Sequence, residues 1–105
     1  MKKKIIILGS TGSIGQNTLN VLKNDKKNFQ VLLLSTNKNV EKILKQAKEF
    51  KVRKIIITDY KKYIHAKKKY KKIKIQIFNK FDLIDKFFNK KNIYYSMVAI
   101  SGLDG

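Results

Sequence analysis

Residues 5–15 read IIILGSTGSIG, and this stretch decides the fold. Its first four residues, Ile5–Leu8, are apolar and mostly β-branched, which predicts a strand buried on both faces of a parallel sheet. Gly9 ends the strand. Apolar residues at positions 14, 19, 21 and 22 then predict a helix over Ser13–Lys23. A strand, a glycine-rich turn and a helix therefore follow one another directly.

The same alternation continues along the chain. Further strands are predicted over Phe29–Ser35, Arg53–Thr58, Ile73–Phe78 and Tyr94–Ile100, with helices over Val40–Phe50, Tyr60–Lys72 and Phe81–Phe88. This order predicts an α/β fold, a Rossmann-like doubly wound parallel sheet with helices on both faces. Residues 1–105 are expected to form one such domain. A glycine-rich turn at Ser101–Gly105 directly follows the last strand, so the domain is expected to be truncated at its carboxyl end.

The composition is strongly basic, with 25 Lys and Arg residues against 7 Asp and Glu residues and a net charge of +18. A nucleic-acid-binding module is therefore an alternative function of a different class. However, Arg53 is the only arginine, and surfaces that bind nucleic acid favour the planar, bidentate arginine side chain. We expect no specific nucleic-acid partner. The absence of Cys excludes thiolate metal sites and cysteine nucleophiles.

Apolar runs are short throughout the chain. None approaches the ~20 residues that a membrane-spanning helix needs. The start MKKKIIILG has the charged and apolar parts of a signal peptide, but its apolar part is too short and no small-residue cleavage site follows. We expect a cytoplasmic protein without a membrane partner.

The glycines at positions 9, 12 and 15 lie between the first predicted strand and the first predicted helix. In that place one glycine permits the tight turn, one lets a pyrophosphate approach the backbone, and one lets the helix pack closely on the strand. The helix N-terminus offers N–H groups and a positive dipole end to phosphates, and Ser10, Thr11 and Ser13 add hydroxyl groups. The spacing is GxxGxxG, a variant of the dinucleotide-binding pattern. The alternative is a tight turn that binds nothing.

The turn after the second predicted strand contains Asn37, Lys38 and Asn39, and no acid lies between Asp25 and Glu41. An acid here would accept a hydrogen bond from the ribose of NAD and would repel a 2′-phosphate. Lysine and amide side chains would attract that phosphate, which favours NADPH as the cofactor. The alternative is that Lys38 is one of many surface lysines and that Asn39 only caps the next helix.

Other candidate groups are few. Ala99, Ile100 and Gly102 follow the last predicted strand, at the sheet edge where α/β proteins bind ligands, although a plain surface turn is the alternative. His65 lies among lysines and is interpreted as a surface residue. Asp82 and Asp85 have no third ligand and make a poor metal site. We therefore assign no catalytic residue and no metal ligand in this chain.

The string ILGSTGSIGQNTLNVL at residues 7–22 resembles the amino terminus of the 1-deoxy-D-xylulose 5-phosphate reductoisomerase family. Residues 29–50 (FQVLLLSTNKNVEKILKQAKEF) and 97–105 (MVAISGLDG) resemble later parts of the same family in register. The resemblance implies NADPH-dependent conversion of that sugar phosphate to 2-C-methyl-D-erythritol 4-phosphate in isoprenoid biosynthesis. It further implies Mg²⁺ or Mn²⁺ and a homodimer in the full-length protein.

The resemblance also carries the family's cofactor contacts to three segments. Thr11, Gly12, Ser13 and Ile14 match the loop facing the pyrophosphate; Asn37, Lys38 and Asn39 match the turn at the 2′-phosphoadenosine; Ala99, Ile100 and Gly102 match the loop near the nicotinamide. Asn37, Leu103 and Asp104 depart from residues common in the family. The family's metal ligands and substrate anchors have no counterpart here, so residues 1–105 alone are expected to be inactive. An alternative is another Rossmann reductase or epimerase, for which Tyr63 and Lys67 have the Tyr-x-x-x-Lys spacing.

Overall fold

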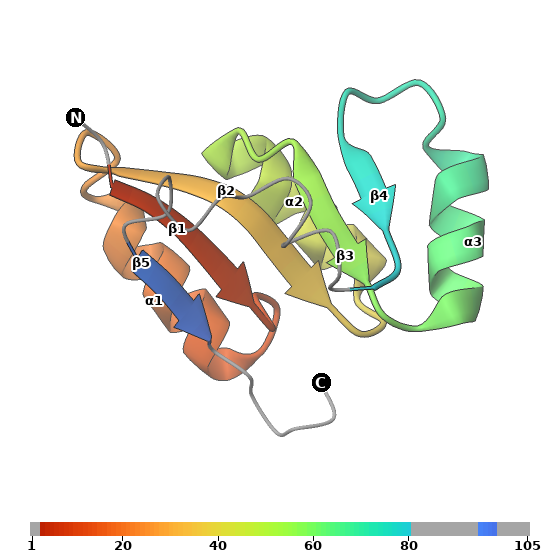
Figure 1. The fold of residues 1–105 in the computed structure, drawn as a ribbon, viewed down its shortest axis with the longest axis horizontal. Helices are drawn as coiled ribbons and strands as arrows, with labels where there is room; N and C mark the ends of the chain where they lie inside the picture. The colour runs from red at the N-terminus through yellow and green to blue at the C-terminus, as the bar shows by residue number, and fades with distance from the viewer. Residues whose placement is uncertain (1–2, 81–94, 99–105) are drawn as a thin grey trace.

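The computed structural model describes residues 3–80 and 95–98, and in these ranges strands alternate with helices along the chain (Figure 1). The strands are β1 (Lys3–Leu8), β2 (Phe29–Thr36), β3 (Lys54–Ile57), β4 (Gln76–Phe78) and β5 (Tyr95–Val98). The helices are α1 (Ser13–Lys23), α2 (Val40–Phe50) and α3 (Tyr60–Lys69). None of these helices is long and apolar enough to cross a bilayer.

The five strands form one sheet in the order β4-β3-β2-β1-β5, and every neighbouring pair is parallel. The chain moves outward from β1 to β4 and then returns to place β5 on the other side of β1 (Figure 1). The strand order therefore reverses at β1. In open α/β sheets, ligands bind at the carboxyl ends of the strands where this reversal occurs. The predicted Rossmann-like parallel sheet is confirmed.

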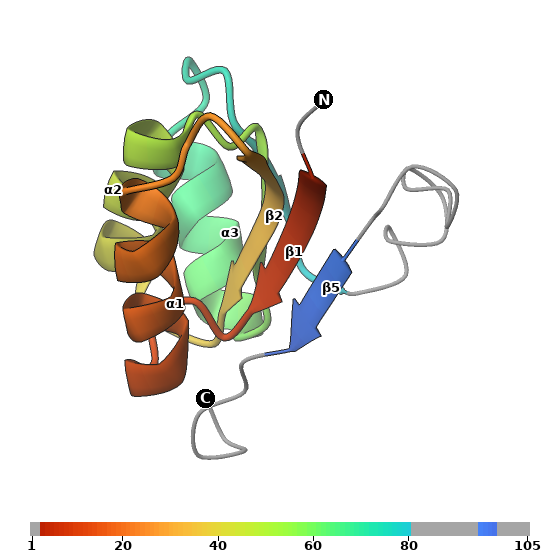
Figure 2. The same cartoon turned by 90° about the vertical axis from the view of Figure 1, so that its left-hand side faces the viewer.

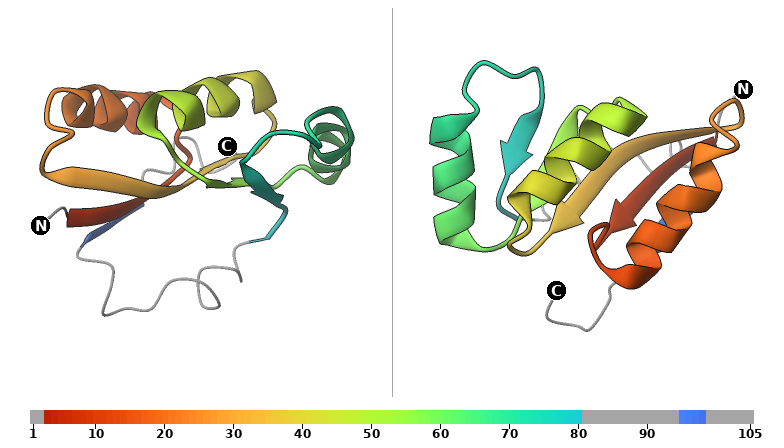
Figure 3. Two further views of the ribbon diagram at one scale, coloured as in Figure 1. Left: turned by 90° about the horizontal axis from the view of Figure 1, so that it is seen from above. Right: turned by 180° about the vertical axis from the view of Figure 1, so that it is seen from behind.

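Helices α1, α2 and α3 all lie on one side of the sheet (Figures 2 and 3). This follows from the topology, because right-handed crossovers that move in one direction across a sheet put their helices on the same face. The helix predicted over Phe81–Phe88 lies outside the described residues. Its contribution to a second helical layer stays a prediction.

The sheet buries apolar side chains on both of its faces. On the helix-covered face, Ile5, Ile7 and Ile55 belong to a cluster that includes the inner sides of α1 and α2. A second, smaller cluster contains Ile6, Leu33 and Ile56, all buried. Burial on both faces is the reason that these strands are continuous apolar runs, without the alternation of a half-exposed strand.

The pairing between β1 and β2 contains one irregularity. Ile5 pairs with Val31, but the next residue, Ile6, pairs with Leu33, so β2 has one extra residue at Leu32. Beyond this point Ile7 pairs with Leu34, which brings the end of β2 alongside the end of β1.

The helix and strand bounds predicted from the sequence agree most closely with the structure where apolar residues recur at a clear period. Helices α1 and α2 have the predicted bounds, whereas α3 ends at Lys69 and not at Lys72, because Tyr70 has left the helical region at φ −112° and ψ 43°. Of the strand predicted over Ile73–Phe78, only the last three residues pair, and they form an edge of the sheet.

We predict that Gly15→Ala destabilises the fold, because a Cβ there would lie 2.4 Å from the Gly9 carbonyl oxygen and 2.6 Å from the Ser10 Cα. These are backbone atoms, so relief requires the helix to move away from the turn. We expect a loss of about 1–3 kcal/mol in the free energy of unfolding, measured by urea denaturation. Asn17→Ala, at an exposed position of the same helix, is the control and is expected to be neutral or slightly stabilising. Equal stability of Gly15→Ala and wild type would contradict the prediction.

Candidate functional site

The candidate site is the glycine loop that joins β1 to α1 at the carboxyl edge of the sheet. Gly9 has φ 72°, in the left-handed region that glycine adopts without strain. This conformation turns the chain sharply out of the sheet directly after Leu8. Because β1 has β2 on one side and β5 on the other, the loop starts where the strand order reverses.

The end of β2 holds this loop in place. The Gly9 N–H donates to Ser35 Oγ at 2.8 Å, and the Ser10 N–H donates to the Ser35 carbonyl at 2.8 Å. On the next residues, the hydroxyl oxygens of Thr11 and Thr36 are 2.6 Å apart. The polar residues that end the apolar strand β2 thus hold the loop, Ser35 through the loop backbone and Thr36 through the Thr11 hydroxyl.

Ser10 links the loop to helix α2. Its side chain is fully buried, and its hydroxyl donates to Gln46 Oε1 at 2.8 Å and lies 3.3 Å from the Ser35 carbonyl oxygen. Gln46 Nε2 in turn donates to the Ser10 carbonyl at 2.9 Å. The glycine pattern alone assigns this hydroxyl to a phosphate, whereas the structure gives it a supporting role inside the protein.

Helix α1 begins with an N-terminus that is open to a ligand. Its N-cap is Gly12, which has no side chain to cap the helix, and its first turn contains no acid. The first N–H groups of a helix have no partner within the helix, so this end has donors and a positive dipole available. Ser13 and Ile14 are exposed there, and the close approach of Gly15 to Gly9 brings the helix end against the loop.

The turn after β2 lies in the neighbouring βα unit. Lys38 is exposed, whereas Asn39 is the N-cap of α2 and accepts from the Lys42 N–H at 3.4 Å. The Asn37 carbonyl accepts from the Asp59 N–H at 3.1 Å. The Asn39 side chain therefore caps α2, as one of the two interpretations of the sequence expects. Lys38 is the exposed cation of the turn.

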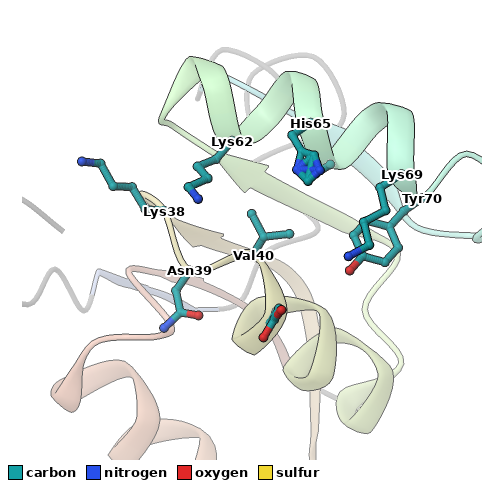
Figure 4. A pocket seen from close by; sticks show the side chains of 9 residues that line it. Lys38, Asn39, Val40, Lys62, His65, Lys69 and Tyr70 are labelled. Atoms are coloured by element: carbon teal, nitrogen blue, oxygen red, sulfur yellow. The ribbon is translucent and has the colours of Figure 1, made fainter.

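A cavity of about 230 Å³ opens between the N-terminus of α2 and one face of α3 (Figure 4). Lys38, Asn39 and Val40 line it from the turn and from α2. Lys62, His65 and Lys69 line it from α3. His65 is exposed, as predicted, but it is part of this cavity and not of the general surface. No spacing rule in the sequence reveals the cavity, because it depends on how α3 packs beside α2.

The structure therefore brings two of the three predicted segments to one edge of the sheet. Ala99, Ile100 and Gly102 lie outside the described residues, although the strand before them ends with Val98 paired to Leu8. Sequence reasoning missed Ser35, Thr36 and Gln46 as supports of the loop. For Ser35 and Thr36 the sequence did contain a signal, because two polar residues end an otherwise apolar strand. Within residues 3–80 and 95–98, no group of three His, Cys, Asp or Glu side chains could hold a metal ion.

Comparison with known proteins agrees with this geometry. The family model for 1-deoxy-D-xylulose 5-phosphate reductoisomerase matches residues 5–105. The reductoisomerase of Pelagibacter ubique is 51% identical over 104 residues, which cover 98% of this chain and 27% of that relative. The reductoisomerase of Phocaeicola vulgatus is 31% identical, over 98% of this chain and 28% of that relative. The chain thus spans about a quarter of the length of these curated relatives.

Solved structures of the same enzyme resemble the chain in fold. The Zymomonas mobilis reductoisomerase in complex with NADPH matches with a TM-score of 0.71 and 26% identity, over 82% of this chain and 23% of that one. A reductoisomerase in complex with magnesium matches with a TM-score of 0.77 and 22% identity, over 91% of this chain and 24% of that one. The glycine loop, the strand order and the match of the family model over residues 5–105 together establish that this chain belongs to the 1-deoxy-D-xylulose 5-phosphate reductoisomerase family.

Proposed function

We propose that this chain is the NADPH-binding part of a 1-deoxy-D-xylulose 5-phosphate reductoisomerase. The observation that carries the proposal is the N-terminus of α1, which has a glycine N-cap, no acid in its first turn and a position at the reversal of strand order. The similar Zymomonas mobilis reductoisomerase is a complex with NADPH, which supports the choice of cofactor. When bound, this cofactor supplies a hydride to the substrate.

The cofactor's pyrophosphate would lie on the open end of α1. The backbone N–H groups of Thr11, Ser13 and Ile14 face the phosphate oxygens in this proposal. The Gly12 N–H donates to the Gly9 carbonyl at 3.1 Å, and Gly12 leaves room for the phosphate to approach. Gly9 and Gly15 shape the loop. Gly9 turns the chain sharply, and Gly15 lets helix α1 pack close to the loop. Ser10 contributes through the same shape, because its side chain is buried.

The 2′-phosphate of NADPH would lie at the turn after β2. Lys38 is exposed there, and neither Asn37 nor Asn39 brings a negative charge. An exposed ammonium group attracts a phosphate dianion and offers three donors to it. Asn39 holds the turn in shape as the cap of α2. We further propose that Ala99, Ile100 and Gly102 approach the nicotinamide.

The remaining parts of the reaction are proposals at the level of the whole protein. We propose that it converts 1-deoxy-D-xylulose 5-phosphate to 2-C-methyl-D-erythritol 4-phosphate with Mg²⁺ or Mn²⁺, as a cytoplasmic homodimer. A related structure is a complex with fosmidomycin and magnesium, which supports a site for both a small ligand and a metal in the family. The described residues contribute cofactor binding to this reaction.

Lys38→Ala is expected to weaken NADPH binding and to leave NADH binding unchanged, because only NADPH carries the 2′-phosphate. Loss of a charged hydrogen bond costs about 1.5–3 kcal/mol, which corresponds to roughly a 10- to 150-fold weaker affinity. Titration of both cofactors followed by nucleotide fluorescence measures the change. Lys45→Ala, an exposed lysine of α2 outside the cavity, is the control. Equal affinity of the wild type for the two cofactors would contradict the proposed preference.

Gly12→Val is expected to weaken NADPH and NADH binding alike, by at least about tenfold, because a branched Cβ occupies the space of the pyrophosphate. The fold is expected to survive, since Gly12 has φ −77° and ψ 173°, a conformation open to any residue. Circular dichroism and cofactor titration on the same sample separate the two effects. Asn20→Val, at an exposed position of α1, controls for valine in the helix. A folded Gly12→Val variant with unchanged affinity would show that Gly12 is only a turn residue.

A further inference from the structure

We infer that Lys62, on helix α3, is a second specificity-determining residue for the cofactor and binds the 2′-phosphate together with Lys38. The inference rests on the proposed function, because it assigns a further contact to the same ligand. It comes from the cavity between α2 and α3, which is lined by Lys38 from one βα unit and by Lys62 from the next.

Backbone hydrogen bonds bring these two lysines to the same place. The Thr58 N–H, one residue beyond β3, donates to the carbonyl of Thr36, the last residue of β2, at 3.0 Å. One residue further along both segments, the Asp59 N–H donates to the Asn37 carbonyl at 3.1 Å. The parallel pairing thus continues past both strands. It fixes the start of α3 against the turn that contains Lys38.

Asp59 also sets the direction of the helix. It is the N-cap of α3, and its Oδ2 accepts from the Lys62 N–H at 3.0 Å. Lys62 therefore lies in the first helical turn, on the face that also carries His65 and Lys69 at helical spacing. In Figure 4 the Lys62 side chain extends from α3 toward the turn of Lys38 and Asn39, while Lys69 and Tyr70 lie at the far end of the cavity.

The electrostatic environment of the cavity suits an anion. Three lysines line it, and Glu41 is the one carboxylate among the described lining residues. Among the described residues, none of these three lysines forms an ion pair. The N-terminus of α2 also begins at this cavity with Asn39, so its positive dipole end adds to the attraction. The cavity volume of about 230 Å³ is several times the ~30 Å³ that a water molecule occupies, so a phosphate group can enter.

The position of Lys62 favours the 2′-phosphate over the pyrophosphate as its partner. The pyrophosphate is proposed to lie on α1, which follows β1, whereas Lys62 is next to the turn that follows β2. A ligand whose pyrophosphate lies on α1 extends its adenosine end along the carboxyl edge toward β2. Lys38 reaches that end from the turn, and Lys62 reaches it from α3.

The test is direct binding to the full-length protein that carries this chain, with NADPH, NADH, 2′,5′-ADP and 5′-AMP as ligands in calorimetric titrations. We expect Lys62→Gln to lower the affinity for NADPH and 2′,5′-ADP about tenfold, with no change for NADH and 5′-AMP. Lys61→Gln is the matched control. It removes the same charge from the same helical turn, but Lys61 does not line the cavity. Both lysines are exposed, so both variants are expected to fold as the wild type does, which circular dichroism verifies.

The possible outcomes separate the inference from the proposal beneath it. Wild-type selectivity for 2′,5′-ADP over 5′-AMP that falls in Lys62→Gln and not in Lys61→Gln supports the inference. Selectivity that is equal in the wild type and in Lys62→Gln overturns it and leaves the NADPH proposal intact. Equal losses in Lys61→Gln and Lys62→Gln also overturn it, because the effect then reflects net charge. A wild type without selectivity refutes the proposed cofactor preference and the inference together.

Discussion

The approach of Gly15 to the Gly9 carbonyl is the constraint on which the rest of the site depends. A Cβ at Gly15 would lie 2.4 Å from that oxygen, so the first turn of α1 can take its place only when this side chain is absent. The loop between the two glycines is then held by Ser35 and Gln46 from β2 and α2. As a result, the open helix end has a fixed position, and a ligand that binds there spends little free energy on ordering the loop.

Charge is distributed unevenly between the two parts of the proposed cofactor site. At α1 the attraction for phosphate comes from backbone N–H groups, because the first turn contains neither an acid nor a base. At the turn after β2 and at α3 it comes from lysine side chains on exposed positions. The first part is common to NADH and NADPH, whereas the second distinguishes them. In the proposed site, discrimination between the cofactors would thus depend on exposed lysine side chains, and the contacts common to both would depend on backbone N–H groups.

The sequence predicted the fold well where apolar periodicity is strong. Strands β1 and β2 and helices α1 and α2 follow from their apolar patterns and from the glycine turn between β1 and α1. The lysine-rich part was predicted less well. Tyr60–Lys69 forms a shorter helix than predicted, and only Gln76–Phe78 pairs as a strand, since lysines leave few apolar positions to define a period. Surface lysines fit helices and loops alike, so they do not mark a boundary.

The sequence predicted the backbone loop of the candidate site but not the residues that hold this loop in place. A glycine pattern reports local conformation, which is why the loop was found from Gly9, Gly12 and Gly15. The hydrogen bonds of Ser10 to Gln46 join residues 36 positions apart, and only the packed structure reveals them. The same holds for the cavity of Lys38 and Lys62, which requires α3 to lie beside α2. A buried serine and a ligand-facing serine look the same in a sequence.

The extra residue at Leu32 in β2 has a consequence for how this strand can change over time. The bulge shifts the alternation of side chains by one position, so Val31 and Leu34, which are three residues apart, belong to the same buried cluster, whereas Leu33 belongs to the other. Deleting the extra residue would therefore restore a regular strand and keep Ser35 beside the Gly9 N–H, whereas a second extra residue would exchange the two faces of everything beyond it. We expect β2 to tolerate the loss of one residue at this point and to reject a further insertion between Leu33 and Ser35.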